Sequence, residues 1–202
     1  MRWFVLVAGI LLSTLALPLL AAADDIGSPG ALAAAQGEAM VQKLDFAGAM
    51  RAYSQAVTAD SRNQAYRDRF MELKRISQLK HYVEARPNAE RWLPMVVTLH
   101  AFYLNEGLDE AALALDRHAH TRLGEPTTAV LLSETLLRMN RPADVVTTLG
   151  ARPAKTWHED VLLGIALARL GKKDEAKAID ARVGAADLNK LVPLQIQDLA
   201  RL

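Results

Sequence analysis

The sequence predicts an all-α fold built from repeated helix pairs, and three observations favour it. Aromatic residues make up only 5% of the 202 residues, whereas Ala and Leu are abundant, which favours packed helices over sheets. From Gly30 onward the chain shows no alternating polar and apolar pattern of useful length, as half-buried strands would require. Short helical stretches separated by small turns recur along the chain instead.

The first 23 residues have the organisation of a secretory signal peptide. A positive start at Met1-Arg2 precedes an apolar run from Phe4 to Leu20, and Ala21 to Ala23 supply the small residues that a signal peptidase accepts. We therefore expect removal of residues 1–23, which leaves a short linker at 24–29 and a periplasmic or secreted chain. The alternative is an inner-membrane anchor formed by residues 3–20, although this run is short for ~30 Å of hydrocarbon.

The composition excludes several kinds of site and partner. The chain has no Cys, which excludes disulfides, thiolate metal sites, cysteine nucleophiles and a lipid-anchored N-terminus. Without residues 1–23 it carries 23 basic and 23 acidic residues, so no net charge draws it to nucleic acid or to anionic lipid. A small basic surplus between Arg62 and Glu90 is intermixed with acids, and we interpret it as a solvated helix face.

Four segments share one pattern: an apolar helical stretch ends at a turn, and a second helix follows with a small residue near its start. From Ala49 to Ala111 there are 62 residues, and the next two intervals, to Val145 and Ala176, are 34 and 31. The first gap has room for one more, degenerate unit. Its helices would lie near Gln64–Arg75 and Ser77–Ala85 and end before Pro87, which cannot continue a helix.

This pattern resembles the tetratricopeptide repeat, a helix–turn–helix unit of about 34 residues. Small and large residues match the family positions in four units: Gly37, Phe46, Ala49, Tyr53 and Ala56; Phe102, Leu108, Ala111 and Leu115; Leu132, Leu136 and Leu149; Leu163, Gly164, Leu167, Gly171 and Ala176. The resemblance implies a right-handed α-solenoid of four to five antiparallel helix pairs over residues 30–186. We expect residues 187–202 to form a C-terminal capping helix whose leucines cover the last pair.

The chain departs from the family pattern in each later unit. Leu99 and Ser133 replace the glycine of the first helix, Asp116 and Asp180 fall at or near apolar positions, and Gly150 and Pro153 cut one second helix short. Small residues at the remaining contact positions allow helices to approach closely. We therefore expect Ala49→Leu and Ala111→Leu to destabilise the fold by about 1–3 kcal/mol through overpacking.

Catalytic and metal-binding motifs are not recognisable, so we predict a protein that is not an enzyme and uses no cofactor or metal. His118 and His120, two apart on a predicted helix, point away from each other, and we interpret them as surface residues. Trp92 and Trp157 open first helices, and we interpret them as helix-entry packing, with a contact to a partner as the alternative.

The resemblance also implies a concave groove, lined by the first helix of each pair, that binds a protein or peptide partner. With units starting at Gly30, Trp92, Pro126 and Trp157, the polar and aromatic groove positions are Glu38, Gln42, His100, Tyr103, Glu134, Arg138, His158 and Arg169. The set lacks the lysine–asparagine clamp with which some family members hold chaperone C-termini. The alternative is that these residues form the hydrophilic side of amphipathic helices.

We predict a non-catalytic scaffold or binding module of the bacterial cell envelope. Two alternatives stay open: an accessory subunit or enzyme of envelope polysaccharide machinery, and a structural oligomerisation spacer. For the groove, we expect Tyr103→Ala combined with Arg138→Ala to weaken partner binding while leaving the melting temperature nearly unchanged.

Overall fold

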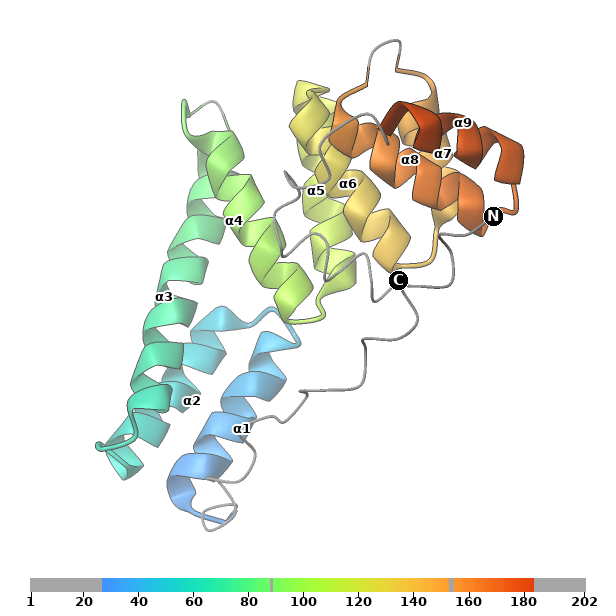
Figure 1. The fold of residues 1–202 in the computed structure, drawn as a ribbon. Coiled ribbons are helices and arrows are strands. Elements are labelled where there is room, and N and C mark those ends of the chain that lie inside the picture. The colour runs from blue at the N-terminus through green and yellow to red at the C-terminus, as the bar shows by residue number, and fades with distance from the viewer. Residues whose placement is uncertain (1–26, 88, 153–154, 184–202) are drawn as a thin grey trace. The chain divides into compact units, whose positions relative to one another are not determined.

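The computed structural model describes residues 27–87, 89–152 and 155–183, and every regular element in these ranges is a helix (Figure 1). The all-α prediction is confirmed for this part of the chain. The predicted signal peptide at 1–23 and the predicted capping helix at 187–202 lie outside it. The helices are α1 (Pro29–Val41), α2 (Phe46–Ala59), α3 (Gln64–Ala85), α4 (Trp92–Asn105), α5 (Asp109–Leu123), α6 (Pro126–Arg138), α7 (Pro142–Gly150), α8 (Trp157–Arg169) and α9 (Lys173–Val183).

One turn geometry joins the two helices of four pairs, α1–α2, α4–α5, α6–α7 and α8–α9. A residue with a left-handed backbone stands in each turn: Leu44 (φ 60°), Gly107 (φ 70°), Asn140 (φ 55°) and Gly171 (φ 76°). The following residue donates its N–H to the carbonyl five positions earlier, as Leu108 does to Tyr103 at 2.8 Å. This Schellman arrangement satisfies carbonyls that a helix end would leave without partners. The same local connection therefore recurs in all four pairs.

The chain divides into two compact units, Met1–Arg75 and Ile76–Leu202, and the division falls within α3. This helix runs without interruption from Gln64 to Ala85. The expectation of two helices here, Gln64–Arg75 and Ser77–Ala85, is therefore wrong. Neither Gly nor Pro occurs within the run, and a single Ser in a helix interior costs too little to end it.

In the first unit, α1 and α2 pack closely because small residues line their contact. A Cβ added to Gly37 would lie 2.7 Å from two ring carbons of Tyr53. Ala49 and Ala56 have no exposed surface. The close helix approach predicted at Gly37 and Ala49 is confirmed.

In the second unit, successive helices from α4 to α9 pack against one another, and the first helices α4, α6 and α8 are also in contact, α6 with each of the other two (Figure 1). The main core lies between α5 and α9 and includes Leu137, Val145 and Leu149, which are fully buried. A second cluster joins the end of α3 to the start of α4, where the Trp92 indole N–H donates to the Val83 carbonyl at 2.9 Å. The interpretation of Trp92 as helix-entry packing is confirmed.

The second unit corrects one residue of the repeat register. Ala112 is fully buried, whereas Ala111 is only half-buried. Counted from the left-handed residue of its turn, Ala112 is equivalent to Ala49, since each follows that residue by five positions. The assignment of Ala111 to the close-contact position, and the destabilisation expected from Ala111→Leu, are therefore wrong by one residue. The predicted shortening of one second helix is confirmed, because α7 has 9 residues and ends at Gly150.

Candidate partner-binding site

Seven of the eight residues predicted for the groove lie on first helices of pairs, and the eighth, Gln42, directly follows one. Glu38 lies on α1 and Gln42 follows its last residue, within the first unit. The other six lie in the second unit, where the contacts of α6 with α4 and α8 bring their helices together: His100 and Tyr103 on α4, Glu134 and Arg138 on α6, and His158 and Arg169 on α8.

His100 is the centre of a buried polar network that joins α4, α5 and α6. Its imidazole Nδ1 lies 2.9 Å and 3.0 Å from the two carboxylate oxygens of Asp116, and its Nε2 lies 3.5 Å from Oε2 of Glu134. The hydroxyl of Thr135 donates to Asp116 at 2.6 Å. Asp116, which the sequence marked as a departure from the apolar pattern, thus occupies a core position because His100 and Thr135 are its partners.

The charge state of His100 follows from these contacts. Burial alone would lower the pKa of this imidazole, but the hydrogen bonds and negative charges of Asp116 and Glu134 outweigh burial and raise the pKa to about 9. The ring is therefore an imidazolium at neutral pH, with each nitrogen directed at a carboxylate. A group in this state holds helices together and does not act as a general base.

Tyr103 lies in the core and not on an open surface. Only 4% of the residue is exposed, and burial, with the negative charge of Glu84, raises the pKa of its phenol to about 12. Replacing it by Ala would remove packing from the core, which typically costs several kcal/mol for a large aromatic side chain. This corrects the expectation that Tyr103→Ala would leave the melting temperature unchanged.

The remaining predicted residues of the second unit are at least partly accessible. Arg138 is exposed and forms an ion pair with Asp109 at 2.6 Å. Arg169 is half-buried and donates to the Leu137 carbonyl at 2.8 Å. His158 is half-buried, with its ring edge-on to the Trp157 indole at 5.0 Å between centroids.

In the first unit, Glu38 is held by two side chains. Its carboxylate accepts hydrogen bonds from the Tyr53 hydroxyl and from Arg69, whose Nε and Nη2 both lie at 2.9 Å. Burial would raise the pKa of Glu38, but the hydrogen bonds and charge of these partners outweigh it and lower the pKa. Gln42 is exposed. The Glu38 carboxylate therefore ties α1 to α2 and α3.

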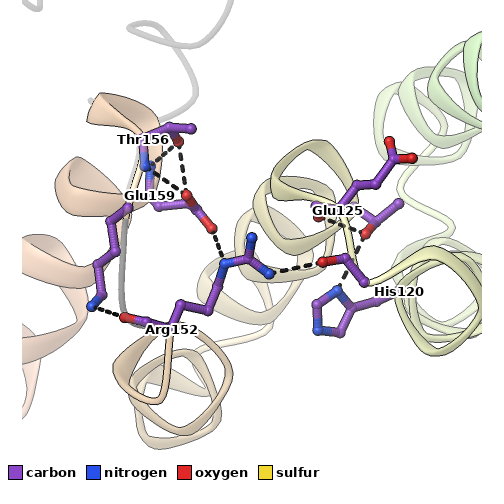
Figure 2. A network of polar contacts seen from close by, with 8 residues as sticks. His120, Glu125, Arg152, Thr156 and Glu159 are labelled. Carbon is purple, nitrogen blue, oxygen red and sulfur yellow. Dashed lines mark hydrogen bonds and ion pairs between the residues drawn. The ribbon is translucent and has the colours of Figure 1, made fainter.

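A further polar network, which the sequence reasoning missed, connects the α5–α6 turn to the start of α8 (Figure 2). The carboxylate of Glu159 is fully buried and pairs through Oε1 with Arg152 Nε at 2.6 Å. Its Oε2 accepts the backbone N–H of Thr156 at 2.7 Å, while the Thr156 hydroxyl accepts the Glu159 N–H. Arg152 also donates to the Gly124 carbonyl at 2.9 Å. The sequence signal was available, because Thr-x-x-Glu before an apolar run is the signature of a capping box.

His120 belongs to the edge of this network. Its Nδ1 lies 3.2 Å from the hydroxyl of Thr128, and burial and the charge of Arg152 lower its pKa, against the opposing charge of Glu159. His118 is exposed, as predicted, and its ring lies edge-on to Trp92. Within the described ranges, no group of three or more His, Asp or Glu side chains is placed to hold a metal ion. None of the helices in these ranges combines the length and the apolar character needed to cross a bilayer.

Comparison with known proteins adds no family assignment: no family model matches the chain, and no curated protein or solved structure is detectably similar to it.

Proposed function

We propose that this chain is a tetratricopeptide-like repeat protein of the bacterial periplasm that binds a protein or peptide partner through the first helices of its pairs. The observation that carries the proposal is the recurrence of one Schellman turn between the helices of four pairs. Repeats of this kind stack into solenoids and act through the surface that successive first helices share. The contacts of α6 with α4 and α8 support such a shared surface in the second unit.

We propose four accessible residues of the second unit as the binding surface and call them the first-helix face: Glu134, Arg138, His158 and Arg169. His100 and Tyr103 are buried and are therefore left out of this face, although His100 contacts Glu134. Both charge signs are present on this face, and Val130 beside them is half-buried. A partner segment with a short apolar side chain between charged residues would complement it. Protein interfaces in general combine apolar contacts with a polar rim.

The test compares two arginine substitutions in the chain that begins at Asp24. Arg138→Ala removes a cation from the first-helix face, and its exposed ion pair with Asp109 is worth at most about 1 kcal/mol, so the fold is retained. Arg117→Ala removes an exposed cation from the second helix α5 and is the matched control.

The wild-type chain serves as bait in a periplasmic extract, and each captured protein is then titrated against the three chains. We expect Arg138→Ala to weaken binding and Arg117→Ala to leave it unchanged. Equal affinities of all three chains would place the interface elsewhere and contradict the proposed face. The localisation is tested separately by the intact mass of the periplasmic protein, which should begin at Asp24. A membrane-bound chain that retains residues 1–23 would favour the anchor.

A further inference from the structure

The outward side of α3 in the first unit carries exposed cations around one exposed thioether. Arg67, Met71, Lys74 and Arg75 are spaced four, three and one residues apart, which places them on one side of a helix. All four are exposed, and Met71 is 57% accessible. We call these four residues the cationic stripe.

The interpretation of this region as a solvated helix face agrees with the exposure of its cations, and the structure adds which acids of α3 have other partners. Glu72 accepts from Arg69 at 2.8 Å, and Glu84 accepts from Lys80 at 2.5 Å. Asp68, which directly follows Arg67 in the chain, is exposed and accepts from the neutral Gln64 amide at 2.7 Å, so it keeps its negative charge. Glu72 and Glu84 are thus paired with cations outside the stripe, and Asp68 is the acid next to it that has no cationic partner within the described ranges. Within the described ranges, no hydrogen bond or ion pair engages the three cations of the stripe.

We propose that the cationic stripe docks an acidic polypeptide segment of a partner protein. Arg67 lies one helical turn before Met71, and Lys74 and Arg75 lie one turn after it. This order complements a segment that carries acidic residues on both sides of one apolar residue. An anionic membrane surface fits less well, because membrane-bound helices insert a broad apolar face. Of the large apolar residues of α3, Leu73, Ile76 and Val83 are buried, Phe70 and Leu79 are half-buried, and Met71 is the exposed one, so α3 presents no broad apolar face. This inference is independent of the first-helix face.

The test uses a fluorescein-labelled 15-residue peptide with four Glu flanking a central Leu, and a second peptide with Lys in place of each Glu. Binding to the chain that begins at Asp24 is measured by fluorescence anisotropy at low and high salt. The stripe variant is Arg67→Gln with Lys74→Gln and Arg75→Gln. The matched control is Lys43→Gln with Arg51→Gln and Arg62→Gln, which removes the same charge from three other exposed positions of the first unit.

We expect the acidic peptide to bind the wild-type chain and the control, and to bind the stripe variant about tenfold more weakly, as the loss of three exposed ion pairs predicts. Raising the salt should erase that difference, because exposed charges are screened. Equal weakening in the control would show general charge attraction and overturn the proposal. So would binding of the basic peptide with similar affinity. Binding to vesicles of anionic lipid without binding to the acidic peptide would assign the stripe to membranes and overturn it as well.

Discussion

The protonated state of His100 makes the stability of the second unit depend on pH in a calculable way. Asp116 and Glu134 face the imidazole from α5 and α6, and Asp116 is fully buried. The pKa is raised from 6.5 in the unfolded chain to about 9 in the folded one. A raised pKa means that the folded state binds the proton more tightly, so the stabilisation is present at low pH and is lost as pH rises through 9.

The size of the effect follows from the two pKa values. The stabilisation is about 3 kcal/mol at pH 6, falls to about 1 kcal/mol at pH 8 and is almost gone at pH 9.5. The free energy of unfolding is measured by urea denaturation at these three pH values in the chain that begins at Asp24. Tryptophan fluorescence reports the transition, because Trp92 and Trp157, the tryptophans of this chain, both lie in the second unit. Measurements end at pH 9.5, since the pKa of the Tyr103 phenol is about 12 when folded and phenol ionisation would contribute at higher pH.

The reference is a chain without the network. Replacing His100 alone would leave Asp116 as an unpaired buried charge, at a cost of about 3–5 kcal/mol. The triple variant His100→Leu, Asp116→Leu and Thr135→Val removes the charges of His100 and Asp116 and the hydroxyl that donates to Asp116. We expect its free energy of unfolding to fall much less between pH 6 and pH 9.5 than that of the wild type. Parallel profiles for the two chains would refute the assignment of a stabilising imidazolium.

Two pairs of substitutions test the helix contacts. Gly37→Ala should destabilise the chain by about 1–2 kcal/mol, because a Cβ 2.7 Å from the Tyr53 ring costs more than the gain in helix propensity of about 1 kcal/mol. Gly164→Ala should change stability little, because its Cβ would lie 3.3 Å from a methyl group of Ile179. Equal urea midpoints for Gly37→Ala and Gly164→Ala would contradict the closer packing at Gly37. Ala112→Leu should destabilise by about 1–3 kcal/mol through overpacking, whereas Ala111→Leu should have a smaller effect. A lower melting temperature for Ala111→Leu than for Ala112→Leu, measured by circular dichroism, would support Ala111 as the close-contact position.

The sequence predicted the helix starts of the second unit because their signals are local. Trp92, Pro126 and Trp157, taken as unit starts, are the first residues of α4, α6 and α8. Proline fits the first turn of a helix, where its missing N–H costs nothing. The one-residue error at Ala111 arose because equivalent positions of the pairs are counted from the left-handed residue of each turn, and in the first pair that residue is not a glycine. Leu44, which occupies that position in the first pair, is a residue type that rarely adopts it.

The polar networks could not be predicted because their members come from different helices. Asp116 stood out as an acid at an apolar position, but its partner His100 lies 16 residues away in the preceding helix. For the same reason His100 and Tyr103 were read as accessible, since helical periodicity places a residue on a side of its helix and does not show what covers that side. The burial of both residues depends on the packing of the neighbouring helices.

In the second unit, three side chains that come later in the sequence bind the backbone of earlier helix ends: Trp92, Arg152 and Arg169. Each side chain donates to a carbonyl at or near the end of an earlier helix: Val83 of α3, Gly124 after α5 and Leu137 of α6. Deleting the chain from Arg152 onward would therefore remove the donor to the Gly124 carbonyl, and deleting α4 onward would do the same to the buried Val83 carbonyl, whereas the Leu137 carbonyl would keep the Asn140 N–H after loss of α8. Progressive shortening from the C-terminal side should thus lower stability in steps larger than the lost apolar contacts alone. The ends of α3, α5 and α6 are in this sense completed by side chains that follow them in the chain.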